Sequence, residues 1–193
     1  MFKSGQQQHG FSLLEMLVAL VIFSIGLLAV AGLQTVSKQA NYEGLQRTTA
    51  SQIAGGLLED IRMNGDAINI YRTADAIGGG SYGGEPAPSC ATGSECNSAQ
   101  KAAHDLWFWE QVLDGNMETN GGAGTGGLML PTLCVTGPAV GGPGIYQVTI
   151  AWRGSASIVN SVNNPCGGAS GNYGDENQFR RILQVPTYID PNF

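Results

Sequence analysis

The chain has 193 residues, a formal net charge of −6 and a pI near 4.7. This negative charge repels nucleic-acid phosphate, so the composition argues against a nucleic-acid partner. The residues that follow Asn64 are enough for one domain of ordinary size with a single hydrophobic core.

A long apolar run begins near the N-terminus, from Gly10 to Leu33, and Glu15 is its only charged residue. At about 1.5 Å per helical residue, the stretch from Phe11 to Leu33 can cross a hydrocarbon core of about 30 Å. Lys3 in the short leader places the N-terminus in the cytoplasm. A carboxylate in such a helix disfavours insertion by roughly 3 kcal/mol, so Glu15 requires a compensating partner.

The helical pattern continues beyond the apolar run, but on one face only. Apolar residues recur there with helical spacing at Ala50, Ile53, Ala54, Leu57, Leu58 and Ile61. We therefore predict one helix from Phe11 to about Asn64, roughly 80 Å long. Its first half must lie in lipid or among copies of itself, and its second half needs a sheet to cover it. The helix contains glycines that indicate close packing or local melting, at Gly26, Gly32, Gly44, Gly55 and Gly56.

An ordinary secretory signal peptide is the alternative interpretation of the N-terminus. Ala29-Val30-Ala31 is similar to a signal-peptidase site, and cleavage after Ala31 would release a secreted soluble binding protein or enzyme. A carboxylate inside the apolar region is unusual for such a peptide. Cleavage would also interrupt a helical pattern that continues to Asn64, so we favour a retained membrane helix.

The motif Gly10-Phe11-Ser12-Leu13-Leu14-Glu15, followed by an apolar helix, resembles the type III signal of type IV pilins and pseudopilins. The resemblance implies that a prepilin peptidase cuts between Gly10 and Phe11 and N-methylates Phe11. It also implies that Glu15 meets the N-terminal amine of a neighbouring subunit. That ammonium would be the counter-charge that Glu15 requires in a low-dielectric filament core.

Later segments resemble those of the PilV-type minor pilins. They are residues 58–64, Asp105-Leu106 with Trp109, and residues 146–152. The resemblance implies an α+β, pilin-like fold, in which a long N-terminal helix packs on an antiparallel β-sheet head. It divides the chain into a leader (1–10), a transmembrane or filament-core half-helix (11–33), an amphipathic half-helix (34–64) and a periplasmic head (65–193).

By the same resemblance, the protein is a minor pilin that primes assembly or forms the tip complex of a type IV pilus. Its partners are then other minor pilins, the major pilin, prepilin peptidase and the inner membrane, with a tip adhesin as a further candidate. It would cross the inner membrane once, with a periplasmic head, before it enters the pilus on the cell surface. A minor pseudopilin of a type II secretion system shares every N-terminal feature and stays an alternative.

Four cysteines follow the membrane segment, at Cys90, Cys96, Cys134 and Cys166. In an oxidising periplasm they should pair, and the sequence alone allows three connectivities. We favour Cys90 with Cys96 and Cys134 with Cys166. A zinc site is the competing interpretation, but the chain has no C-x-x-C pair and His104 is the only histidine after the leader.

The head is predicted to contain a helix followed by strands. Apolar spacing predicts an amphipathic helix over 99–113, before Asp114-Gly115. Alternation predicts a strand with one buried face at 146–152, and further strands lie at 128–135 and 181–185, the latter ending at Pro186. The aromatic residues 107–109 are expected to pack the helix on the sheet, with one ring left out.

No catalytic constellation is present, and we expect neither an enzyme nor a cofactor. His104 and Asp105 are adjacent on a helix and point apart, so His104 should be an ordinary surface histidine. The stretch from Asp114 to Gly121 is similar to the start of a calcium loop. It has Thr119 where glycine is required and Thr125 where a bidentate glutamate belongs, so a polar turn is expected and no metal.

Overall fold

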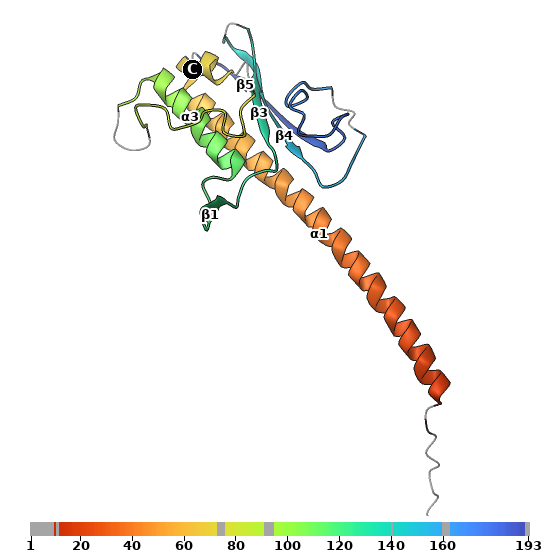
Figure 1. Cartoon of the computed structure of the whole chain (residues 1–193). Coiled ribbons are helices and arrows are strands. Elements are labelled where there is room, and N and C mark those ends of the chain that lie inside the picture. Colours follow the sequence, from red (N-terminus) through yellow and green to blue (C-terminus); the bar gives the residue numbers. More distant parts are fainter. Residues whose placement is uncertain are drawn as a thin grey trace, which may run out of the picture. The chain divides into compact units, whose positions relative to one another are not determined.

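The structure is a computed structural model that describes residues 10, 12–72, 76–90, 95–139, 141–159 and 163–191. The chain forms two compact units, Met1–Tyr42 and Glu43–Phe193. The boundary between them falls within one continuous helix, α1 (Leu13–Met63), which is the long helix expected from the sequence (Figure 1). Phe11, the predicted first residue of this helix, lies outside the described residues.

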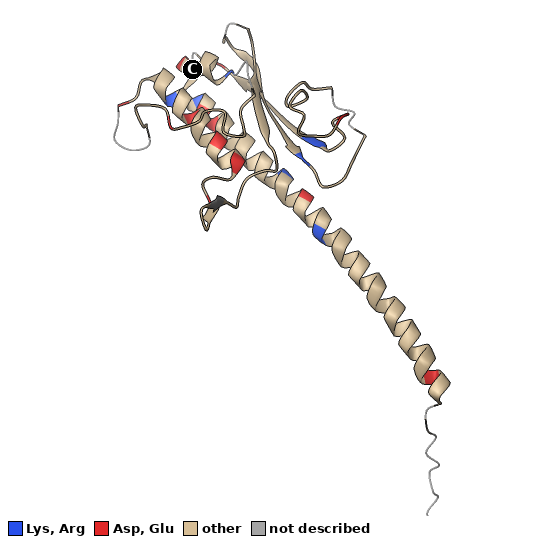
Figure 2. Ribbon diagram, viewed as in Figure 1, with Lys and Arg blue, Asp and Glu red and all other residues tan. Residues whose placement is uncertain are grey.

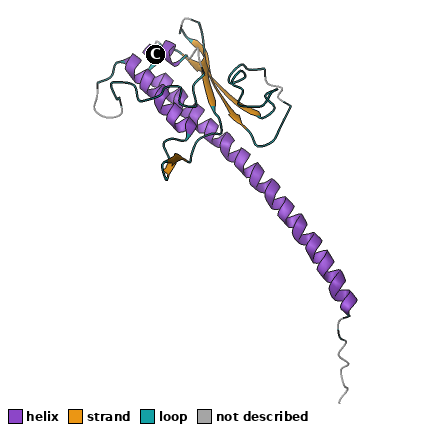
Figure 3. Ribbon diagram, viewed as in Figure 1, coloured by secondary structure: helices purple, strands orange, loops and turns teal. Residues whose placement is uncertain are grey.

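In the first unit, α1 is an unbroken helix (Figure 3). It is largely apolar, and every described side chain there is exposed. The helix is long and apolar enough near its N-terminus to cross a membrane. The hydroxyl groups of Ser24 and Thr35 donate to the carbonyl oxygens of Leu20 and Ala31, at 2.7 and 3.1 Å. Both groups are thus satisfied within the helix, as a hydrocarbon environment requires.

In the second unit, the same helix buries one face. Its buried residues are Gln46, Ala50, Ile53, Ala54, Leu57, Leu58 and Ile61. The six apolar members are the predicted stripe, and they join the hydrophobic core of the head. The chain then continues through a short 3-10 turn, η1 (Gly65–Ala67), and the short helix α2 (Ile68–Tyr71).

Helix α3 (Ser98–Asp114) confirms the second predicted helix within one residue at each end. Asn97 begins it with a capping box, in which the Asn97 side chain accepts from the Gln100 amide and the Gln100 side chain accepts from the Asn97 amide. Gly115 ends it in the left-handed conformation, with φ of 79°. A side chain is excluded at Gly115, because its Cβ would lie 1.9 Å from the carbonyl oxygen of Gly126.

The main sheet is antiparallel, in the order β3-β4-β5. Its strands are β3 (Thr132–Thr136), β4 (Gly144–Arg153) and β5 (Arg180–Ile189). A separate small hairpin joins β1 (Thr119–Asn120) and β2 (Ala123–Gly124). The long helix and this antiparallel head together make the expected α+β, pilin-like fold.

The prediction that Pro186 ends the last strand is wrong, because β5 continues to Ile189. Pro186 pairs with Gln147 of β4. In the described sheet β5 is an edge strand, and every second residue of an edge strand turns its nitrogen away from the neighbouring strand. A proline is tolerated at such a position because no ladder hydrogen bond needs its missing N–H.

The expected buried face of β4 is confirmed, because Tyr146, Val148, Ile150 and Trp152 all lie in the core. The other face is not uniformly exposed, however, since Thr149 and Ala151 are also buried. The segment 163–173 covers them, and the Tyr173 hydroxyl group there lies 3.0 Å from Thr132 Oγ1 and donates to the Leu130 carbonyl. The sheet is therefore buried on both faces over part of its length.

Two disulfides tie the head together. They join Cys90 to Cys96 and Cys134 to Cys166, which are the favoured pairings. The first closes a short loop just before α3. The second fastens the segment that covers the sheet to strand β3, and Cys166 is buried.

Candidate functional sites

The N-terminal site residues lie at the start of α1. Gly10 is exposed and precedes the helix, and Phe11 lies outside the described residues. The Ser12 side chain accepts a hydrogen bond from the Glu15 amide at 3.2 Å, as an N-cap residue does. Glu15 lies in the first turn and is exposed. It is the only charged residue between Leu13 and Ser37, so this part of the helix offers its carboxylate no cation (Figure 2).

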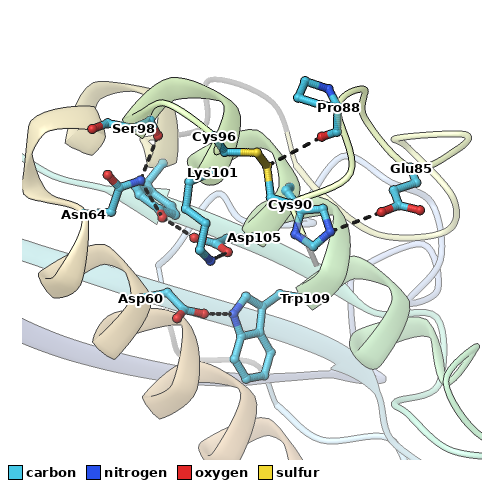
Figure 4. A network of polar contacts seen from close by, with 12 residues as sticks. Asp60, Asn64, Glu85, Pro88, Cys90, Cys96, Ser98, Lys101, Asp105 and Trp109 are labelled. Atoms are coloured by element: carbon cyan, nitrogen blue, oxygen red, sulfur yellow. Dashed lines mark hydrogen bonds and ion pairs between the residues drawn. A yellow bond between two sulfur atoms is a disulfide. The ribbon is translucent and has the colours of Figure 1, made fainter. Parts of the chain in front are cut away.

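A polar seam joins α1 to α3 in the head (Figure 4). The Trp109 indole group of α3 lies against Gly56 of α1, where a Cβ atom would approach Trp109 Cη2 to 2.2 Å. One turn further along α1, Asp60 Oδ2 accepts a hydrogen bond from Trp109 Nε1 at 2.7 Å. The glycine and the carboxylate thus hold one tryptophan in place, which fixes the register of the two helices.

The seam continues at the C-terminal end of α1. Asn64 Nδ2 donates to the Ser98 carbonyl oxygen at 2.8 Å and to the Tyr71 hydroxyl group at 3.2 Å. The Tyr71 hydroxyl group donates in turn to the buried carboxylate of Asp105, which also pairs with Lys101. Burial and the hydrogen bond to Asp105 both raise the pKa of Tyr71 well above its ordinary value. Tyr71 therefore stays neutral and acts as a donor.

His104 differs from the expected surface histidine, because only 8% of its surface is exposed. Its Nε2 atom lies 3.3 Å from Glu85 Oε1, and its ring lies 5.4 Å from that of Trp107. The segment that contains Glu85 therefore covers a histidine that sequence spacing placed at the surface. The aromatic residues 107–109 are all half-buried, so none is left out as a fully exposed ring.

A second feature that the sequence analysis missed is a carboxylate anchor for the glycine-rich segment 78–82. Glu110 of α3 is fully buried, and it accepts hydrogen bonds from the amides of Gly78, Ser81 and Tyr82. One turn later in α3, Asp114 accepts from the amides of Gly79 and Gly80, both at 2.9 Å. The polar turn expected after α3 thus begins with a carboxylate that is already bound within the head.

A groove of about 950 Å³ lies on the outer face of the sheet. One side is the glycine-rich segment, the other is residues 164–172, and Cys134 and Thr149 contribute to its floor. Within the part of the chain that the structure describes, no three His, Cys, Asp or Glu residues are placed to hold a metal ion. The lining includes one carboxylate, that of Asp114, which is already bound by backbone amides, and otherwise offers neutral groups.

An apolar, fully exposed helix segment and an α+β head make a pilin-like fold that fits a membrane-anchored subunit. Comparison with protein families agrees with this class. A family model described as prokaryotic N-terminal methylation motif matches residues 5–31, and one described as type IV pilin Tt1218 matches residues 32–107. The chain is a type IV pilin-like protein, and both matches point to a structural subunit.

No curated protein and no solved structure matches the chain. The two family matches do not separate the PilV-type minor pilins from other type IV pilins, so that finer resemblance stays a prediction. Residues 108–193 lie beyond both matches. The main sheet, the second disulfide and most of the residues that line the groove therefore lie outside the matched region.

Proposed function

We propose that the protein is a minor pilin that primes assembly or forms the tip complex of a type IV pilus. Prepilin peptidase removes the leader 1–10 and N-methylates Phe11. The mature subunit waits in the inner membrane with its head in the periplasm, and then enters the filament. Its partners are other minor pilins and the major pilin, with a tip adhesin as a further candidate.

The observation that supports this proposal most directly is the lone carboxylate of Glu15. It lies in the first turn of a helix segment whose apolar side chains are all exposed. A charge in that environment is unfavourable unless an opposite charge reaches it. The new ammonium group of Phe11 on a neighbouring subunit is such a charge, and it exists only after cleavage at Gly10. The proposal therefore links processing to assembly.

The methylation motif that covers residues 5–31 supports the same order of events. The alternative of cleavage after Ala31 would cut α1 within its continuous helical span. A minor pseudopilin of a type II secretion system would use the same N-terminal chemistry. Purification from membranes with identification of the co-purifying pilins or secretion proteins separates these two assignments.

Processing can be tested by mass spectrometry of the mature protein. We expect an N-terminus at N-methylated Phe11, and a precursor that accumulates in the Gly10→Ala variant. The matched control is Gly32→Ala, because Gly32 lies in the same exposed helix and a Cβ atom added there would meet no other atom within 4 Å. A mature chain that begins at Gly32 in the wild type, or an uncut Met1 in cells with active peptidase, would contradict the proposal.

A further inference from the structure

Two polar side chains tie α1 to the head before its apolar stripe begins. Glu43 and Gln46 lie about one helical turn apart and so share a face of the helix. Glu43 reaches the connection that follows β4, whereas Gln46 reaches the segment that precedes β3. Ala50 follows on the same face and is the first fully buried apolar residue of α1.

Glu43 accepts four hydrogen bonds from two separate segments. Its Oε1 atom accepts from the Ser155 amide at 2.7 Å and from the Ser155 hydroxyl group at 2.8 Å. The Arg181 guanidinium group of β5 binds both carboxylate oxygens, at 3.1 and 3.2 Å. Such bidentate pairs fix orientation as well as distance.

The charge of Glu43 is maintained by these contacts. Partial burial alone would raise the pKa of Glu43, but the hydrogen bonds from Ser155 and Arg181 outweigh burial and lower it. Arg181 is itself held, because its Nη2 atom donates to the Ala156 carbonyl at 2.8 Å. Gly154 leaves the space for the guanidinium group, since a Cβ atom there would lie 2.5 Å from Arg181 Cζ.

Gln46 provides the second tie, which reaches the segment that precedes β3. Only 6% of its surface is exposed. Its Nε2 atom donates to the Gly127 carbonyl at 3.2 Å, and its Oε1 atom accepts from the Met129 amide at 3.1 Å. Both ends of the amide are therefore used, and they hold the segment that leads into β3.

We propose that Glu43 and Gln46 are positioning residues that fix the direction in which α1 leaves the head, and that filament assembly requires this fixed direction. The inference rests on the proposed function. Hydrogen bonds have preferred directions, whereas apolar contacts are non-directional. Two ties to separate segments resist both tilt and rotation of the helix, while the apolar stripe keeps the head folded without them.

The contacts of Glu43 and Gln46 with the head, which we call the joint, can be tested in the full chain with two spin labels. One label replaces Ser37 on the exposed part of α1, and the other replaces Gln184 on β5, as Ser37→Cys and Gln184→Cys. Both sites are exposed, and all four natural cysteines are in disulfides, so the labels are unique. We expect double electron–electron resonance to give a broader distance distribution in Glu43→Gln than in the wild type. The melting temperature should fall by less than about 5 °C.

The assembly test uses the same variant without labels. We expect the amount of Glu43→Gln protein in sheared filaments to fall about fivefold relative to the wild type, which corresponds to the net contribution of about one ordinary hydrogen bond. The control is Glu59→Gln, because Glu59 is an exposed carboxylate of the same helix that pairs only with Arg62 among the described residues. It should change neither measurement.

Three results would be decisive. An unchanged distance distribution in Glu43→Gln would overturn the joint, and a broadened one with normal incorporation would overturn its role in assembly. A broadened distribution with reduced incorporation would support both. If the wild type itself is absent from filaments, the proposed function fails, while the distance measurement still tests the joint.

Discussion

The two parts of α1 form one continuous helix but follow different rules. Between Leu13 and Tyr42 the helix is apolar around much of its circumference, and all its side chains are exposed. Between Glu43 and Met63 it is amphipathic, and it buries one stripe in the head. Hydrogen bonding within the backbone is the same in both parts, so the difference lies in the surroundings that the side chains require. Changes in the first part should therefore act on assembly, and changes in the buried apolar stripe of the second part should act on the stability of the head.

The largest expected effect comes from the exposed part, in the variant Glu15→Ala. It removes the unfavourable charge from the membrane helix, so insertion and cleavage should continue or improve. It also removes the counter-charge for the neighbouring Phe11 ammonium group, so assembly should fail. Cells should contain normal amounts of mature protein but fewer pili and less subunit in sheared fractions. Wild-type piliation in this variant would show that Glu15 is not a docking charge.

The next effect concerns the head alone. The Cys134–Cys166 disulfide spans 32 residues and the Cys90–Cys96 disulfide spans 6. Loop-closure entropy predicts losses in the free energy of unfolding of about 4 and about 2 kcal/mol, respectively. Urea unfolding of the double variants Cys134→Ser/Cys166→Ser and Cys90→Ser/Cys96→Ser measures both. Equal losses would mean that the covering segment 163–173 is held mainly by its other contacts.

A smaller effect is expected when alanine replaces single glycines of α1, and its size should depend on what each glycine contacts. Gly56→Ala forces a methyl group into Trp109 and should lower the free energy of unfolding by about 1–3 kcal/mol. Gly55→Ala and Gly32→Ala meet no atom within 4 Å, so they should be neutral or stabilise the helix by up to about 1 kcal/mol. Chemical unfolding followed by tryptophan fluorescence compares the three. A harmless Gly56→Ala would refute the close packing of the seam.

The smallest effect is a pH dependence at the first residue of the buried part. The pKa of Glu43 is lower in the folded protein than in the unfolded chain. Its contribution to stability is therefore present above about pH 4.3, the unfolded value, and is lost as the pH falls through the lower folded value. Because Glu43 is 25% exposed, we expect at most about 1 kcal/mol. In urea unfolding, the difference in stability between wild type and Glu43→Gln should be smaller at pH 3 than at pH 5.

Local pattern was enough to predict both long helices and the core strand. The stripe from Ala50 to Ile61 and the alternation from Tyr146 to Trp152 each follow from a period that one element imposes on its own residues. The end of β5 was predicted wrongly because proline was judged without its neighbours. Whether a proline is tolerated depends on which edge of the sheet its nitrogen faces, and that is a property of the strand order.

The sequence by itself determined the apolar helix with its single carboxylate, the methylation motif and the amphipathic continuation, since these depend only on residues close together along the chain. Tertiary structure decided which groups meet across long separations. It brought Trp109 to Gly56 and Asp60, buried His104 beside Glu85, and joined Glu43 to Arg181. Such contacts depend on how distant segments pack, and the spacing of residues along one chain does not contain that information.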